Sequence, residues 1–274
     1  MQILLIIVFS DIKCLIYSGK IGASFGLRLQ AGISSGDIKC NLKGVVLGDS
    51  WISSVDSVAS WPTFLKESNL LDDSAFQRVS QMAQQTVAAV ENSQLTQATQ
   101  LWKQTQDLII QLTDQVNPYN IQQHHAPNCN RPSTNALMNT QIRQKLQIIP
   151  NDVVWDQHRW DVFESLSGEF MKPAISTVGQ LLSTGIKVAI FQGEFDLVCD
   201  TPGTMAWIDK LPWYGVSQFK GAPQTDLTAN GVSRGYVKRF ENLVYYFIRN
   251  AGHMVPVDDP DAALEMLREI VTEP

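Results

Sequence analysis

The sequence predicts an α/β fold in which a mostly parallel sheet is flanked by helices, and three features carry that prediction. Residues 243–248 are continuously apolar or aromatic, and residues 186–191 form a second short run of the same kind. Short runs of this type indicate strands buried on both faces. Between an earlier strand at 44–47 and these runs, apolar residues recur at helical spacing. The chain of 274 residues, 44% hydrophobic, has ample material for a packed core.

Each of the two apolar runs is followed by a polar group of catalytic type. His253 comes just past the end of 243–248, after the turn residues Asn250 and Gly252, and Asp196 follows 186–191 by a few positions. Ligands and catalytic groups collect at strand ends of this kind in open α/β sheets. A histidine that stood there alone would be interpreted as a turn residue that bonds locally.

The chain order of an acid followed by a histidine matches the second half of the Ser…Asp…His order of α/β-hydrolases. In that chemistry the carboxylate holds the imidazole in one tautomer, and the imidazole takes a proton from the nucleophile. We therefore predict that His253 is the base and that Asp196 orients it. Glu194 is a rival for the orienting role, although a solvated turn residue is the preferred interpretation.

Three stretches in order resemble the serine carboxypeptidases, namely residues 44–51, 193–199 and 251–256. Residues 48–53, with 56–58 after them, are similar to the retinoid-inducible or vitellogenic-like branch of that family in particular. The resemblance extends from about Tyr17 to the C-terminus.

This resemblance implies an α/β-hydrolase fold with a helical cap. It also implies that Asp196 and His253 occupy the acid and base positions and that the substrate is a peptide or protein, from which C-terminal amino acids are removed. The compartment it implies is secretory or lysosomal.

The predicted organisation has two parts. Residues 1–53 and 172–274 form the C-terminal portion of a hydrolase core, and residues 54–171 form a helical lid inserted over the strand ends. The lid contains a helical hairpin that breaks near 91–93. Its apolar stripes consist of Phe76, Val79, Ala83, Val87 and Val90 in one helix, and of Leu95, Ala98, Leu101, Leu108 and Leu112, with Trp102 beside them, in the other.

The remaining segments are assigned from turn residues and periodicity. Asp49 and Ser50, which follow the strand at 44–47, are either pocket-rim groups or turn residues. The other predictions are a loop at 117–133, short helices at 137–146 and 175–182, an antiparallel pair at 219–221 and 235–240, and a helix from Pro260 that covers the sheet.

The nucleophile is the point at which the chain departs from the family pattern. Residues 17–20 match the tail of the family's G-E-S-Y-G-G-K elbow, which puts Ile16 at the nucleophile position and Leu15 at that of the glutamate. The family's early strands, oxyanion-hole glycines and carboxylate-binding groups also have no counterpart. The expectation is a family member that is inactive or impaired in this chain. The alternatives are a non-catalytic peptide- or protein-binding relative and a truncated isoform.

Ser24 offers a second reading of the nucleophile, because residues 22–26 satisfy the pattern G-x-S-x-G. A nucleophile elbow needs an apolar strand that runs straight into its first glycine. Residues 18–21 do not form one, so Ser24 is assigned to a helix, and its role as a nucleophile is the minority interpretation.

Charge and cysteine content exclude several other functions. The net charge of −6 without a basic stripe argues against nucleic acid as a partner. The four cysteines have no metal-ligand spacing, and His124 and His125 are interpreted as loop residues, so no metal or cofactor is expected. The apolar run at 4–9 is too short to span a membrane and lacks the features of a convincing signal peptide, which leaves a buried strand as the plainer interpretation.

Overall fold

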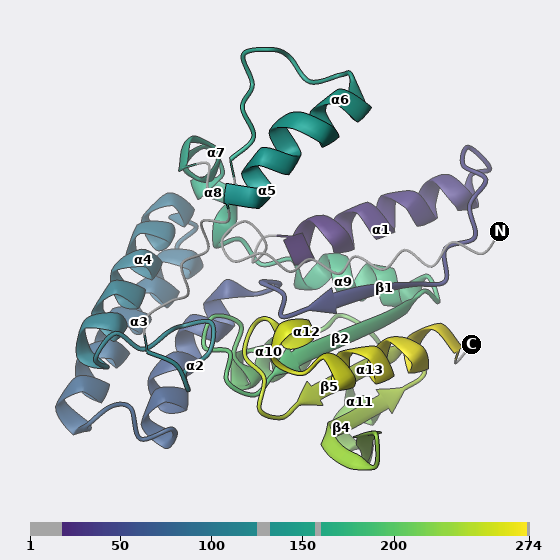
Figure 1. Cartoon of the computed structure of the whole chain (residues 1–274). Coiled ribbons are helices and arrows are strands. Elements are labelled where there is room, and N and C mark those ends of the chain that lie inside the picture. The colour runs from purple at the N-terminus through teal and green to yellow at the C-terminus, as the bar shows by residue number, and fades with distance from the viewer. Residues whose placement is uncertain (1–17, 125–131, 157–159, 273–274) are drawn as a thin grey trace.

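The structure, a computed structural model, describes residues 18–124, 132–156 and 160–272. Within this part, one five-stranded sheet has the order β1-β2-β5-β4-β3 (Figure 1). The strands are β1 (Gly44–Gly48), β2 (Lys187–Gly193), β3 (Gln224–Ala229), β4 (Val232–Phe240) and β5 (Leu243–Ile248). β1, β2 and β5 are parallel neighbours, and β4 and β3 continue the sheet antiparallel. The predicted α/β class is confirmed, with a mixed sheet.

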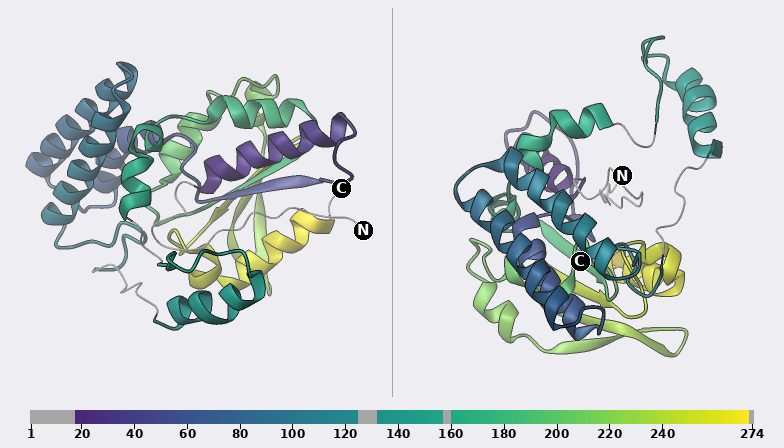
Figure 2. Two further views of the ribbon diagram at one scale, coloured as in Figure 1. Left: turned by 90° about the horizontal axis from the view of Figure 1, so that it is seen from above. Right: turned by 90° about the vertical axis from the view of Figure 1, so that its left-hand side faces the viewer.

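The parallel strands are buried on both faces, which explains why their sequences are continuously apolar. Val45 and Leu47 pack on one face, together with α1 (Ser18–Ser34) and α9 (Ile175–Ser183), while Val46 packs on the other. The second face is covered by α13 (Pro260–Thr272), the helix that was predicted from Pro260 (Figure 2). Three short helices lie between residues 201 and 258: α10 (Thr201–Ile208), α11 (Val216–Gly221) and α12 (Val255–Asp258).

One strand of the predicted antiparallel pair is wrong. Residues 235–240 do lie in β4, but residues 219–221 belong to α11, and the partner of β4 is β3. Phe219 supplied the apolar signal because the helix buries it against the sheet. β3 is an edge strand with mostly exposed polar side chains, so it carries little apolar pattern.

The predicted helical hairpin is present as α3 (Asp73–Glu91) and α4 (Leu95–Leu112), with α2 (Ser54–Glu67) packed beside it. These helices share an apolar core with Trp51, which follows β1, and with Phe170 of α8 (Ser167–Phe170), next to α7 (Trp160–Ser165). Their description as a lid implies closure over the strand ends and stays a prediction.

The buried face of α4 is rotated relative to the predicted stripe. Its buried residues are Ala98, Thr99, Trp102, Thr105 and Ile109, whereas the predicted leucines are only partly buried. Threonine is accommodated on this face because each hydroxyl donates to the carbonyl four residues earlier, as Thr105 does to Leu101. Hydrophobicity alone therefore misplaced the centre of the buried face.

The predicted helix at 137–146 is part of a helical rod made of α5 (Pro132–Leu137), η1 (Met138–Ile142) and α6 (Arg143–Leu146). The rod stands apart from the sheet and from α2–α4 (Figure 2). Among all helices of the described residues, none combines the length and the apolar character needed to cross a membrane. The strand predicted at the N-terminus and Cys14, Cys129 and His125 lie outside the described residues.

Candidate functional site

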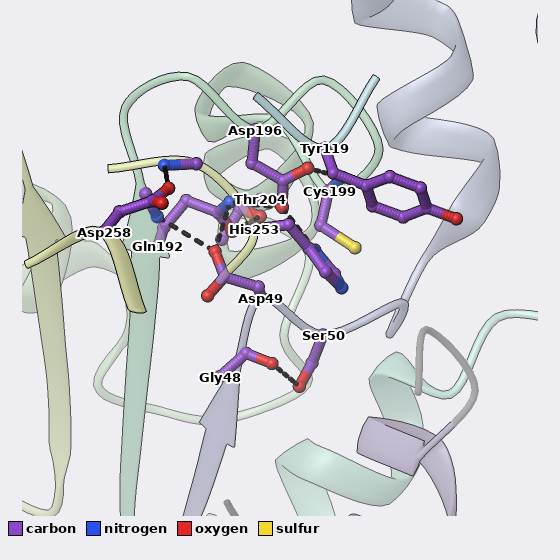
Figure 3. A network of polar contacts seen from close by, with 12 residues as sticks. Gly48, Asp49, Ser50, Tyr119, Gln192, Asp196, Cys199, Thr204, His253 and Asp258 are labelled. Atoms are coloured by element: carbon purple, nitrogen blue, oxygen red, sulfur yellow. Dashed lines mark hydrogen bonds and ion pairs between the residues drawn. The ribbon is translucent and has the colours of Figure 1, made fainter. Parts of the chain in front are cut away.

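Polar side chains gather where β1, β2 and β5 end. Because these strands are parallel neighbours, their carboxyl ends meet at one edge of the sheet. Asp49 follows β1, Asp196 follows β2 and His253 follows β5 (Figure 3). Three segments distant in sequence therefore converge at the edge where open α/β sheets place their ligands.

The two predicted site residues are in contact. Nδ1 of His253 lies 2.8 Å from Oδ2 of Asp196. Asp196 is 0% exposed and His253 is 7% exposed. The carboxylate of Glu194 instead accepts a hydrogen bond from the backbone N–H of Asn250 at 2.8 Å. Asp196, and not Glu194, is thus the acid beside the imidazole.

This contact depends on a close approach between the segments that follow β2 and β5. A Cβ atom on Gly193 would lie 2.1 Å from the carbonyl oxygen of Gly252, so a larger residue there would push the two segments apart. The backbone N–H of Phe195 donates to Ala251 at 2.8 Å and fastens them together. The absence of a side chain at Gly193 is what lets His253 reach Asp196.

Tyr119 holds His253 from the other side. The backbone N–H of His253 donates to the carbonyl of Tyr119 at 2.7 Å, and the two rings lie 5.5 Å apart. The neighbouring carbonyl of Pro118 accepts from Leu197, just past Asp196. Sequence reasoning assigned this segment to a loop and missed its role. Its proline and asparagines carry no signal for a contact with a residue so distant in sequence.

Asp196 receives two further hydrogen bonds. The backbone N–H of Cys199 donates to Oδ1 at 3.2 Å, and Nε2 of Gln192 donates to Oδ2 at 3.2 Å. A carboxylate held in this way is an acceptor for Nδ1–H of His253, which assigns the proton to Nδ1 and leaves Nε2 as the basic nitrogen. The arrangement can accept a proton from a nearby hydroxyl.

Asp49 is also buried, and this was not apparent from the sequence. Its side chain accepts hydrogen bonds from Nε2 of Gln192 and from the N–H of Gly193, both at 2.9 Å. Burial raises the pKa of Asp49 well above its ordinary value, and the charge of Asp196 raises it further. Ser50 behaves as a turn residue, because its hydroxyl donates to the carbonyl of Gly48.

Three side chains of metal-ligand type lie at the same place. Among the described residues, Asp196, Cys199 and His253 bring three potential ligand atoms within 4.8 Å of one another. Burial raises the pKa of the Cys199 thiol well above its ordinary value, with a further contribution from Asp196. Since the carboxylate and the imidazole are already hydrogen-bonded to each other, we assign no metal to this cluster.

The start of α1 lies against the same edge of the sheet. A Cβ on Gly19 would lie 2.4 Å from the Cβ of Ser50, so the two backbones are in close contact. Ile16 and Leu15, which precede this helix, lie outside the described residues. Ser24 is an exposed residue within α1, and its assignment to a helix is confirmed.

Comparison with known proteins gives a consistent result. The family model described as serine carboxypeptidase matches residues 16–273. The retinoid-inducible serine carboxypeptidase of Homo sapiens is 40% identical over 94% of this chain and 63% of its own length. Serine carboxypeptidase-like 51 of Arabidopsis thaliana is 35% identical over 94% of this chain and 64% of its own. The chain thus spans just under two thirds of these relatives.

The fold has a counterpart among solved structures. Kex1Δp, a prohormone-processing carboxypeptidase from Saccharomyces cerevisiae, superposes with a TM-score of 0.75. The match covers 93% of this chain and 60% of the yeast chain, at 23% sequence identity. The similarity confirms the predicted α/β-hydrolase fold.

Proposed function

This chain belongs to the serine carboxypeptidase family, and on that premise we propose that Asp196 and His253 are the acid and base of a site that releases C-terminal amino acids from peptides. The observation that carries the proposal is the 2.8 Å contact between Nδ1 of His253 and Oδ2 of Asp196 at the parallel strand ends. It is the arrangement that triad chemistry requires of an acid and a base.

The reaction would proceed through an acyl-enzyme. Nε2 of His253 takes the proton of a serine hydroxyl as the hydroxyl oxygen attacks the carbonyl carbon of the last peptide bond. The same proton then passes to the departing amine, and the C-terminal amino acid leaves. Water, deprotonated by His253 in its turn, cleaves the ester and restores the serine. Asp196 stays ionised throughout and stabilises the imidazolium that forms in each step.

We further propose that hydrolysis is impaired in this polypeptide. The resemblance assigns the nucleophile position to Ile16, whose side chain has no atom that can attack a carbonyl. Loss of the nucleophile from a comparable triad lowers turnover about a millionfold. The alternative is a non-catalytic relative that binds peptides or a protein partner.

A fluorophosphonate probe, which reacts with activated serines, tests this proposal. The probe is expected to label the wild-type chain no more strongly than it labels the His253→Ala variant. Labelling of the wild type that disappears in Ser24→Ala would contradict the impairment and identify Ser24 as the nucleophile. Absence of labelling, together with a cooperative thermal transition and saturable binding of an N-blocked peptide, would support the binding alternative.

The acid–base assignment is tested separately with Ile16→Ser, which supplies a hydroxyl at the assigned position. Labelling of this variant is expected to exceed that of the wild type and to vanish when His253→Ala is added. Equal labelling of Ile16→Ser with and without His253→Ala would contradict the role of His253 as the base. No gain in labelling would contradict the assignment of Ile16 to the nucleophile position.

The compartment forms part of the proposal. We assign the protein to the secretory pathway or lysosome, with the family resemblance as the only support. Fractionation of cells that express the native transcript would test this, and recovery in the cytosol would contradict it.

A further inference from the structure

Two buried carboxyl groups share one donor at the strand ends. Nε2 of Gln192 lies 2.9 Å from Oδ1 of Asp49 and 3.2 Å from Oδ2 of Asp196. Asp49 is 3% exposed and Asp196 is 0% exposed. Two ionised carboxylates so close to one another, with little access to water, repel strongly, and sites of this kind hold a proton on one of them.

The orientation of the Gln192 amide follows from the two carboxyl oxygens beside it, which accept hydrogen bonds from Gly193 N–H and from His253 and so face a donor. The hydroxyl of Thr204, which can donate or accept, donates to Oε1 of Gln192 at 3.1 Å. Nε2 therefore points at the two carboxyl groups, as Figure 3 shows, and each of its two hydrogens has one acceptor.

The second oxygen of Asp49 identifies the group that holds the proton. Oδ2 of Asp49 is buried and receives no hydrogen bond from any donor in the described part of the chain. As part of an ionised carboxylate it would be a buried acceptor without a partner, which costs about 1–3 kcal/mol. A proton on Oδ2 removes one of the two negative charges, so that the two carboxyl groups no longer repel each other as ions.

The charged neighbours of Asp49 favour the same protonation state. Asp196, which follows β2, and Asp258 of α12 both act on Asp49 as negative charges and raise its pKa, after the larger effect of burial. Tyr245 of β5 and the Cys199 thiol also face this group, and the pKa of each is raised well above its ordinary value, chiefly by burial. The cationic form of His253 is compensated by Asp196 rather than by Asp49.

We propose that Asp49 is a neutral carboxylic acid that, through the shared amide of Gln192, positions the carboxylate of Asp196 for His253. Asp196 receives hydrogen bonds from Gln192 and Cys199 in addition to that from the imidazole. Asp49 is a positioning residue, because it acts on His253 through Asp196. The assignment concerns the site of the proposed function but not its hydrolysis, so the two can fail separately.

The protonation state can be measured on the wild-type protein labelled with ¹³C at the aspartate carboxyl carbon. The Asp49 signal is identified by its disappearance in Asp49→Asn. It is expected to remain at the chemical shift of a neutral acid from about pH 5 to 7, where ordinary aspartates are ionised. The internal control is the exposed Asp73, whose pKa is lowered by its hydrogen bond with Lys66. An Asp49 signal in the carboxylate range at pH 7 would overturn the proposal.

The positioning role is tested through the Nδ1 proton of His253 in ¹H–¹⁵N spectra. Asp49→Asn keeps a neutral side chain and an oxygen for Gln192 and Gly193, so the Nδ1 resonance is expected to stay in place. Asp49→Ala removes that oxygen, and the resonance is expected to shift or to vanish by exchange.

Two outcomes would overturn the role. One is an Asp49→Ala variant with an unchanged Nδ1 resonance. The other is an Asp49→Asn variant that loses the resonance although its thermal transition is intact, because that result would require an ionised carboxylate at position 49. If Asp49→Ala does not fold, the Asp49→Asn comparison and the ¹³C measurement still decide.

Discussion

The strand-end site and the helical core beside it are both buried, but they are held together by different interactions. At the site, hydrogen bonds link Asp49, Gln192, Asp196 and His253. In the helical core, the rings of Trp51, Trp61, Trp102 and Phe170 pack against one another. The centroids of contacting rings lie 4.6–6.3 Å apart. Aromatic packing tolerates small displacements, whereas a hydrogen-bonded carboxylate does not. The helical core therefore provides bulk stability and the strand ends provide geometry.

The two regions meet in the loop after β2. The side chains of Leu197, Val198 and Cys199 belong to the helical core, while Asp196, directly before them, faces the polar network. The helical core thus anchors the loop that carries the acid. Disruption of the core is expected to lower stability most, and disruption of the network is expected to lower it less while altering the site more.

The largest effect is expected from Trp51→Ala. Trp51 is 1% exposed and contacts three other aromatic rings, so its truncation leaves a large cavity. The free energy of unfolding, measured with urea, is expected to fall by about 3–5 kcal/mol. Ile148→Ala is the control, because Ile148 is 80% exposed and its loss should change stability by no more than about 0.5 kcal/mol. A loss for Trp51→Ala as small as that of the control would contradict the role of this core.

Lys20 tests the connection between the two regions. From α1, its ammonium donates to the carbonyls of Phe170 and Lys172 at 2.7 Å each. Burial lowers the pKa of Lys20 from 10.5 to about 7. Between these two values the unfolded chain holds more protons than the folded one, so the free energy of unfolding rises with pH. The cost of burying the charge is present in full below about pH 7.

Removal of the Lys20 ammonium should therefore make the free energy of unfolding depend less steeply on pH. Relative to Lys20→Met, the wild type is expected to gain up to about 3 kcal/mol in the free energy of unfolding from pH 7.5 to 9.5. Lys103→Met, on the exposed side of α4, is the matched control and should leave the wild-type slope unchanged. Parallel pH profiles for the wild type and Lys20→Met would show that Lys20 does not titrate in this window.

A smaller loss of stability than that of Trp51→Ala is expected from Gln192→Leu at the site. The substitution keeps the approximate volume but removes the donor that Asp49 and Asp196 share, and it leaves the Thr204 hydroxyl without its acceptor. The free energy of unfolding should fall by about 1–3 kcal/mol. In contrast to Trp51→Ala, this variant should also shift the Nδ1 resonance of His253. An unchanged resonance would show that the amide does not support the acid.

The elements that could be predicted from the sequence are those with a strong local signal. The apolar runs marked β1, β2 and β5, and the helical spacing marked α3 and α4. Asp196 and His253 were identified because each follows such a run. β3 was missed because a mostly exposed edge strand lacks an apolar pattern. The buried face of α4 was misplaced because its threonines are polar, although their hydroxyls are hydrogen-bonded to carbonyl groups within the helix.

By itself the sequence determined the buried strands, the acid and the base that follow two of them, and the family, because each depends on residue types within a few positions of one another. Only the tertiary structure decided which groups support the acid. Asp49 and Gln192 are 143 residues apart, and they meet because β1 pairs with β2 in a parallel register that no local pattern specifies. The proton assigned to Asp49 likewise arises from burial and from a second carboxylate, both of which exist only after the strands have assembled.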